Sequence, residues 1–91
     1  MRAGFKKINT FLMVVETGSF EEAAKRLYIT PSAVSLRLSS LENEVGEKLI
    51  LRRRPCVPTA KGEIFYQYAL ALREVKLQLD NAFNSKAADD K

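Results

Sequence analysis

The chain has 91 residues, of which 46% are apolar and 29% charged, and its formal net charge is +4. This length allows one small folded domain, and no apolar run approaches the ~18–20 residues of a membrane-spanning helix. Because the chain has no histidine and a single cysteine, Cys56, the composition excludes an internal disulfide and Ser-His or Cys-His catalysis, and it disfavours the common metal sites.

The sequence favours a binding protein over an enzyme. The serines have no evident general base, since the carboxylates are expected at helix caps or on exposed helix faces, and we predict no cofactor and no metal. Residues 1–62 carry 11 basic and 6 acidic side chains, whereas residues 63–91 carry 4 and 5, so the first part suits a polyanionic partner. No cleavage signal follows the basic and apolar N-terminus, so we expect a cytoplasmic protein without a membrane partner.

The first two predicted helices are short and amphipathic. Residues 5–16 place apolar side chains three or four positions apart, at Phe5, Ile8, Leu12 and Val15. Gly18 suits the end of this helix. Ser19 and Glu22 match a capping box, which predicts that the next helix spans residues 20–27.

The third predicted helix, residues 31–45, has a strong start signal. Thr30 is a favourable N-cap, and Pro31 falls at the first helical position, where its missing N–H costs nothing. The buried stripe is predicted from the spacing of Val34, Leu38, Leu41 and Val45. The opposite surface carries Ser32, Ser35, Leu36, Arg37, Ser39 and Ser40.

After Gly46 the pattern changes to two short strands and then to a long helix. Residues 49–51 and 56–57 are predicted as a small hairpin around the turn formed by Arg52, Arg53, Arg54 and Pro55. A helix is expected from about Ala60 to Phe83, with an apolar seam of heptad spacing at Phe65, Tyr68, Leu72, Val75 and Leu79. A second stripe at Tyr66, Leu70 and Leu77 predicts that this helix packs both on the domain body and on a second chain.

Together these elements predict a mostly α fold, a winged helix-turn-helix of three helices and a small β-hairpin wing, followed by a long C-terminal linker helix. A helix fits the DNA major groove, where Ser, Thr and Arg reach phosphates or base edges and Leu36 contacts a thymine methyl. The three arginines suit phosphates or the minor groove. The alternative interpretation is a plain helical bundle with solvated serines, an exposed leucine and a solvated arginine loop. Cys56 is predicted as a small apolar strand residue rather than a redox sensor.

The sequence resembles the N-terminal DNA-binding domain of the LysR-type transcriptional regulators. The matching string is FLMVVETGSFEEAAKRLYITPSAVSLRLSSLENEVGEKLILRRR, followed by PTAKGEIF. Its specific parts are GSF-x-x-AA-x-x-L, SAVS, LE-x-x-x-G-x-x-L and PT-x-x-G. The wing string RRRPCVPTAKG is further similar to the arginine/lysine-export regulator branch of the family.

The resemblance implies a homodimer, paired through antiparallel linker helices, that binds an inverted-repeat operator in double-stranded DNA. By position it implies DNA contacts from the start of the third helix, from the cap of the second helix and from the wing. These residues are Thr30, Pro31, Ser32, Ser35, Leu36 and Arg37, then Ser19, then Arg52, Arg53, Arg54 and Pro55.

This sequence departs from the family pattern at two positions of the reading helix. Pro31 stands where the family commonly has glutamine, and Leu36 stands where glutamine or arginine is common. We therefore expect a more apolar readout that includes thymine methyl groups. The family's effector-binding domain is not expected in this chain, so a small-molecule effector would act only through that absent domain.

The expected organisation is a winged helix-turn-helix over residues 1–59, a dimerising linker helix over residues 60–84 and a flexible tail over residues 85–91. We predict a sequence-specific DNA-binding domain in the cytoplasm, associated with the nucleoid. The alternative is a helical protein-interaction or dimerisation module that does not bind specific DNA. An enzyme is disfavoured by the missing histidine and the lack of a Gly-rich phosphate loop.

Overall fold

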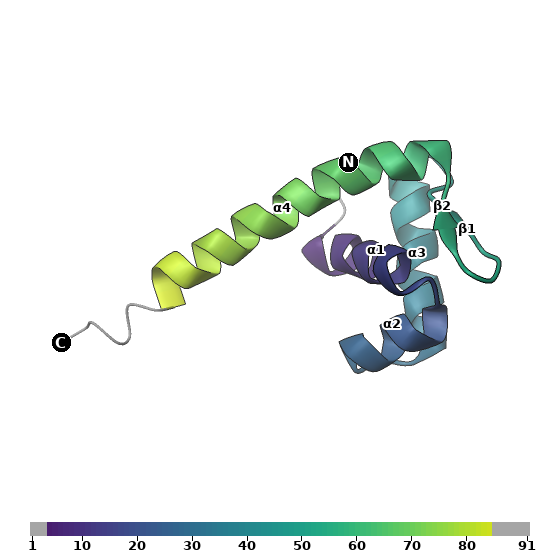
Figure 1. The fold of residues 1–91 in the computed structure, drawn as a ribbon, viewed down its shortest axis with the longest axis horizontal. Helices are drawn as coiled ribbons and strands as arrows, with labels where there is room; N and C mark the ends of the chain where they lie inside the picture. The colour runs from purple at the N-terminus through teal and green to yellow at the C-terminus, as the bar shows by residue number, and fades with distance from the viewer. Residues whose placement is uncertain (1–3, 85–91) are drawn as a thin grey trace.

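The computed structural model describes residues 4–84, which form a three-helix body, a small hairpin and one long helix (Figure 1). Helix α1 spans Phe5–Thr17, α2 Phe20–Leu27, α3 Pro31–Val45 and α4 Ala60–Asn84, and the strands are β1 Ile50–Leu51 and β2 Val57–Pro58. The mostly α winged helix-turn-helix predicted from the sequence is confirmed. The predicted flexible tail, residues 85–91, lies outside the described residues.

Local capping fixes the boundary between α1 and α2. Gly18 adopts a left-handed conformation with φ +71° and donates its N–H to the carbonyl of Val14 at 2.8 Å, which is a conformation that glycine adopts without strain. Ser19 Oγ accepts a hydrogen bond from the N–H of Glu22 at 3.1 Å. The N–H of Ser19 donates to Thr17 Oγ1 at 3.3 Å, so the reciprocal half of the predicted capping box is made by threonine rather than by glutamate.

The connection from α2 to α3 is a tight turn that ends in a strong cap. Tyr28 takes the left-handed conformation, with φ +58°, at the end of α2. Thr30 Oγ1 then accepts a hydrogen bond from the N–H of Ala33 at 3.0 Å, and Pro31 is the first helical residue of α3. The predicted start of α3 is therefore confirmed, together with its physical reason.

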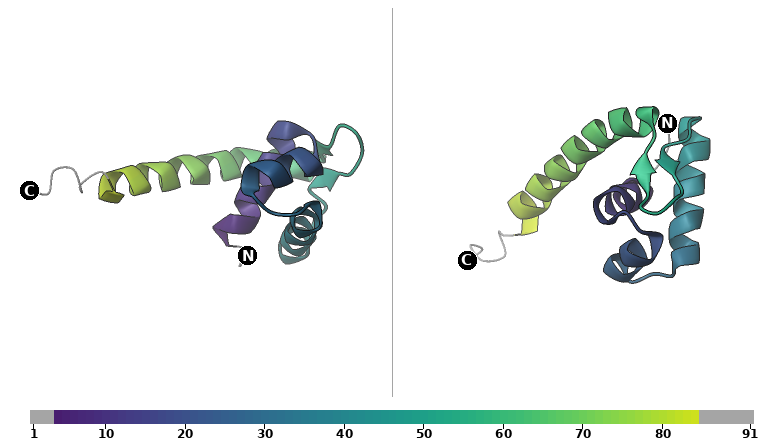
Figure 2. Two further views of the ribbon diagram at one scale, coloured as in Figure 1. Left: turned by 90° about the horizontal axis from the view of Figure 1, so that it is seen from below. Right: turned by 45° about the vertical axis from the view of Figure 1, so that its right-hand side comes forward.

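Helices α1, α2 and α3 pack against one another (Figure 2). The hydrophobic core lies among them and also includes Ile50 of β1 and Ala69 of α4. The predicted stripe of α3 is buried at Val34, Leu38 and Leu41, whereas Val45 is half-buried. The residues of α1 and α2 that complete the core are Ile8, Phe11, Leu12, Val14, Ala23 and Ala24. Because alanines line the buried side of α2, this short helix packs close to its neighbours.

The hairpin pairs antiparallel, with Ile50 opposite Pro58 and Leu51 opposite Val57. Pairing begins one residue later than predicted on each strand. The reason is that Leu49 is buried and Cys56 donates its N–H to the carbonyl of Gly18 at 2.9 Å, so both residues belong to the core side of the hairpin. Cys56 is free and buried.

Glu42 contradicts the expectation that every carboxylate caps a helix or faces solvent. Its side chain is only 5% exposed, and Oε2 accepts hydrogen bonds from the backbone N–H groups of Leu49 at 2.8 Å and Ile50 at 3.2 Å. Oε1 lies 3.9 Å from Lys48 Nζ and 3.7 Å from Arg52 Nη2. Burial is tolerated because the charge is both hydrogen-bonded and paired. Through these contacts, Glu42 fastens the start of the hairpin to α3.

Helix α4 begins in contact with the hairpin and then extends away from the body (Figure 1), so the molecule measures 51 × 25 × 19 Å. Thr59 Oγ1 donates to the carbonyl of Lys48 at 2.6 Å and accepts from the N–H of Gly62 at 2.9 Å. Further along, the ring of Phe65 packs edge-on against Phe11, with centroids 5.2 Å apart. Among residues 4–84, no helix is long and apolar enough to cross a membrane.

Gly62→Ala tests the contact between α4 and the hairpin. A Cβ at this position would overlap the carbonyl oxygen of Leu49 and lie 2.9 Å from its carbonyl carbon and 3.1 Å from Pro58 Cβ. Since backbone atoms cannot move aside cheaply, we expect a loss of about 1–3 kcal/mol in the free energy of unfolding, measured by urea unfolding with far-UV circular dichroism. Gly4→Ala is the control, because nothing lies within 4 Å of its added Cβ, and a similar loss in both variants would contradict the packing argument.

Candidate nucleic-acid interface

The start of α3 presents small side chains to solvent. Thr30, Pro31 and Ser32 are exposed, and Leu36, about one turn further on, is 71% exposed. Thr30 Oγ1 accepts the capping hydrogen bond from Ala33, which leaves the hydroxyl proton of Thr30 for an acceptor outside the helix. The helix N-terminus also favours a nearby anion, so this end suits a phosphate and a neighbouring apolar contact.

Arg52, predicted as a wing residue, lies across the side of α3. Its Nη1 donates to Ser35 Oγ at 2.8 Å, and its Nη2 donates to Ser39 Oγ at 2.9 Å. The guanidinium also faces the ring of Phe20, 5.2 Å from its centroid, and is held by the buried charge of Glu42. The sequence places Arg52 in a basic loop, but the carboxylate on α3 attracts its side chain inward. Arg52 thus joins the wing to the outer flank of α3.

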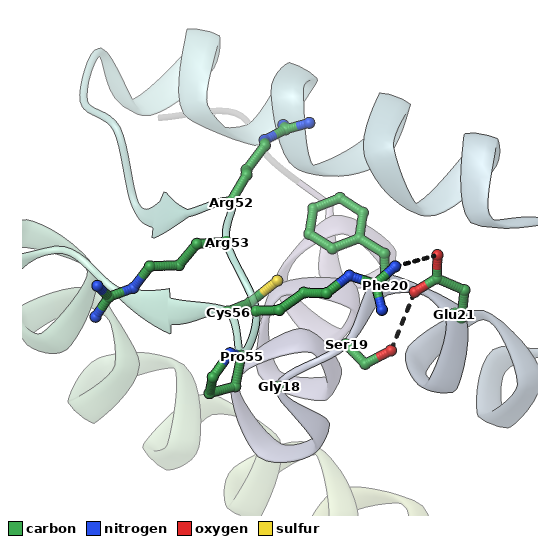
Figure 3. A pocket seen from close by; sticks show the side chains of 9 residues that line it. Gly18, Ser19, Phe20, Glu21, Arg52, Arg53, Pro55 and Cys56 are labelled. Carbon is green, nitrogen blue, oxygen red and sulfur yellow. Dashed lines mark hydrogen bonds and ion pairs between the residues drawn. The ribbon is translucent and has the colours of Figure 1, made fainter.

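The rest of the wing faces a groove next to the N-terminus of α2. This groove has a volume of about 550 Å³ and is lined by residues 18–21 and 52–56 (Figure 3). Arg54 is 90% exposed, and its Nη2 lies 3.7 Å from Glu21 Oε2. In Figure 3, the side chain of Arg53 extends away from Ser19 and Glu21. The exposed wing charge is therefore carried by Arg53 and Arg54.

Ser19, predicted to touch phosphate, is engaged with a neighbouring carboxylate. Its Oγ donates to Glu21 Oε1 at 3.2 Å while accepting from the N–H of Glu22 (Figure 3). Hydrogen bonds from the Glu21 backbone N–H and from Ser19, together with the charge of Arg54, hold the pKa of Glu21 below its usual value. Glu21 is thus an ionised carboxylate at neutral pH, placed between a hydroxyl and a guanidinium that would both suit a phosphate.

Arg37 lies apart from the other predicted contact residues. Its Nη1 is 3.5 Å from Thr10 Oγ1 on α1, in a half-buried position. The structure therefore brings Ser35, Ser39 and the wing together on one flank of α3 and directs Arg37 toward the body.

The predicted seam of α4 divides between the body and the surface. Phe65 packs against Phe11 of the core, so its side chain faces the body and not the exposed surface on which the rest of the seam lies. The other four side chains are between 47% and 71% exposed, namely Tyr68, Leu72, Val75 and Leu79. From the second predicted stripe, Tyr66 and Leu70 pack against the core, whereas Leu77 is exposed. One apolar face of α4 therefore covers the body, and the other faces solvent.

Two residues that matter for the surface were not predicted from the sequence. No sequence pattern indicated that Glu42 is buried, because its partners are backbone N–H groups seven and eight positions away. Glu21 had a partial signal, since it lies in the first turn of a helix capped by Ser19, but its proximity to Arg54 depends on the folded wing. In the described part of the chain, no group of His, Cys, Asp and Glu side chains could hold a metal ion.

The fold and this surface define a winged helix-turn-helix protein, with the outer flank of α3 and the wing joined by Arg52. Residues 5–63 match the model of the family described as bacterial regulatory helix-turn-helix protein, lysR family. The chain belongs to this family, and the resemblance read from the sequence is confirmed.

The names of similar proteins agree with this family assignment. The HTH-type transcriptional regulator LysG of Mycobacterium bovis is 57% identical over 49 residues, covering 54% of this chain and 16% of the relative. The lysine export transcriptional regulatory protein LysG of Corynebacterium glutamicum is 42% identical over 77 residues, covering 80% of this chain and 27% of the relative. Both names agree with the predicted similarity to the arginine/lysine-export branch. The chain spans between about a sixth and a quarter of their lengths.

Among solved structures, the DNA-binding domain of BenM in complex with the benA site 1 DNA is similar, with a TM-score of 0.85 and 34% identity. The match covers 92% of this chain and 96% of that chain. The similarity therefore includes the body, the wing and most of α4.

Glu21→Gln should raise the affinity of the chain for a DNA duplex about threefold. The substitution removes a negative charge beside Arg54 and weakens the acceptor that Ser19 now contacts, so both groups become available to a phosphate. Fluorescence anisotropy at fixed salt measures the dissociation constant. Glu22→Gln is the matched control, since it makes the same charge change one residue along the same helix turn. Equal gains in both variants would mean that only net charge matters.

Proposed function

We propose that this chain is the sequence-specific, double-stranded DNA-binding part of a LysR-type transcription regulator. The observation that carries the proposal is the Arg52 bridge, which makes the wing and the flank of α3 one continuous surface. Family membership and the similarity to a DNA-bound domain support it. An α-helix followed by a basic wing suits a major groove and its adjoining minor groove.

On this proposal, α3 enters the major groove with its N-terminal end. Pro31 and Ser32 lie at that end, and Leu36 offers an apolar contact for a thymine methyl. Arg53 and Arg54 with Pro55 would follow the neighbouring minor groove or its phosphates, and Ser19 would contact phosphate at the start of α2. Because much of the affinity then comes from phosphate neutralisation, binding should weaken steeply as salt is raised.

The exposed face of α4 supports the proposal of a homodimer. A contiguous row of apolar side chains, each about half exposed or more, is unusual on a small monomer and suits a helix–helix interface. The row is Tyr68, Leu72, Val75 and Leu79. Two copies paired antiparallel through this face would place their α3 helices on an inverted repeat.

The binding site for an effector that regulates such a protein would lie outside residues 1–91. The relatives are several times longer than this chain, so we propose that any small-molecule effector acts through a further domain of the parent protein. On this proposal, the protein acts in the cytoplasm, associated with the nucleoid.

Selection of bound duplexes from a random DNA library, with the purified chain at near-physiological salt, tests the proposed function. We expect enrichment of an inverted repeat whose half-sites lie about one helical turn apart. Enrichment of a single half-site would retain sequence reading but contradict the dimer. If no sequence is enriched, specific DNA binding by this chain is refuted, and the alternative of a helical interaction module is favoured.

Leu36→Arg should change the preferred half-site. Arginine donates two hydrogen bonds to guanine O6 and N7, whereas leucine offers only apolar contact, so we expect a shift from thymine toward guanine at one position. The same selection measures this shift. At that position, the arginine variant should bind duplexes with guanine about tenfold or more tightly than duplexes with thymine. Leu36→Met is the control, because it keeps an apolar side chain of similar volume. An unchanged preference in the arginine variant would mean that Leu36 does not contact bases.

A further inference from the structure

The hydroxyl groups of Ser35 and Ser39 lie one helical turn apart on the flank of α3 that faces the wing. Each Oγ is within hydrogen-bonding distance of a different Nη atom of Arg52, at 2.8 and 2.9 Å. Arg52 is itself held by the buried carboxylate of Glu42 and by the ring of Phe20. The guanidinium is therefore held with one N–H of each Nη group aimed at α3.

The direction of these two hydrogen bonds is determined by chemistry. A guanidinium carries five N–H donors and no acceptor, and it stays protonated in proteins. Ser35 Oγ and Ser39 Oγ must therefore accept from Arg52. Since each hydroxyl has a single proton, that proton points away from Arg52 and needs a different acceptor.

The helix does not take up these protons. On α1, Thr10 Oγ1 donates to the carbonyl of Lys6 and Thr17 Oγ1 donates to the carbonyl of Met13, both at 2.8 Å. Within residues 4–84, no such bond to a preceding carbonyl is made by Ser35 or Ser39. Both side chains are half-buried, so each hydroxyl can turn its free proton toward an acceptor at the surface of α3.

We infer that Arg52 is a positioning residue that turns the hydroxyl protons of Ser35 and Ser39 toward DNA. The inference rests on the DNA binding proposed above and specifies its chemistry. Groups that can accept are the phosphate oxygens, N7 and O6 of guanine, N7 of adenine and O4 of thymine. The amino groups of cytosine and adenine can only donate in the major groove, so they cannot take up these two protons.

A mutant cycle on the selected duplex separates positioning from direct contact. The Ser35→Ala/Ser39→Ala pair should lower the affinity about tenfold, and Arg52→Lys should lower it about fivefold, because a lysine ammonium does not provide the planar fork. In the Ser35→Ala/Ser39→Ala background, Arg52→Lys should cause no further loss beyond about twofold. Equal losses in both backgrounds would overturn the inference, since Arg52 would then act on DNA directly or only hold the wing.

Arg26→Lys is the matched control for the arginine substitution. Arg26 is exposed on α2, and this substitution makes the same chemical change at a residue outside the proposed DNA surface. The Arg26→Lys variant should therefore bind the duplex with the affinity of the unsubstituted chain. Urea unfolding of every variant checks that the fold is retained.

Modified duplexes identify the acceptor. Single 7-deaza purines remove N7, and single methylphosphonates remove the charge of one phosphate. At least one modification should weaken binding by the unsubstituted chain severalfold and have no effect on binding by the Ser35→Ala/Ser39→Ala variant. If the serine variant is insensitive to a 7-deaza purine that weakens binding by the unsubstituted chain, the acceptor is that base edge. If it is insensitive to such a methylphosphonate, the acceptor is that phosphate. If every sensitive position remains sensitive in the serine variant, the inference is refuted.

A measurement on the free chain keeps this inference separable from the proposed function. Hydrogen bonds to two serines slow the rotation of the Arg52 guanidinium, so its Nη protons should give separate NMR resonances. These resonances should shift in the Ser35→Ala/Ser39→Ala variant, whose side chains cannot accept from Arg52. Unchanged resonances would show that the two bonds do not hold Arg52 and would overturn the inference, whether or not the chain binds a selected duplex.

Discussion

The buried carboxylate of Glu42 fixes the position of the wing relative to α3. One oxygen accepts the N–H groups of Leu49 and Ile50, and the other attracts Arg52. Hydrogen bonds to a charged group are each worth about 1.5–3 kcal/mol, and their loss would leave two buried N–H groups without a partner. Since Arg52 in turn holds two serines of α3, the proposed polar surface for DNA depends on a contact made in the protein interior.

The same hairpin also sets the direction of α4. Thr59 caps this helix and bonds to the carbonyl of Lys48, while Gly62 allows the helix to approach Leu49 closely. One face of α4 then covers Phe11, and the opposite face remains apolar and exposed. The wing is thus tied to α3 on one side and to α4 on the other. The proposed DNA surface and the proposed dimer surface therefore have a fixed relative orientation within one chain.

Most of the fold could be predicted from local signals, because the caps at Gly18, Ser19 and Thr30 and the spacing of apolar residues determine where helices begin and end. The site was less predictable. A glutamate in the last turn of a helix is usually exposed, and only the folded hairpin supplies the backbone donors that allow Glu42 to be buried. Likewise, three consecutive arginines look equivalent in the sequence, but the structure gives Arg52 a role distinct from that of its neighbours.

Footprinting of the selected duplex, with hydroxyl radicals for the backbone and dimethyl sulfate for guanine N7 in the major groove, tests the central claim most directly. The claim is that α3 and the wing of each chain act as one unit within a two-fold dimer. The account predicts two protected segments about one helical turn apart, related by two-fold symmetry, each consisting of a major-groove region with a protected minor-groove backbone beside it. A single protected segment, or major-groove protection without the adjoining minor-groove region, would contradict it.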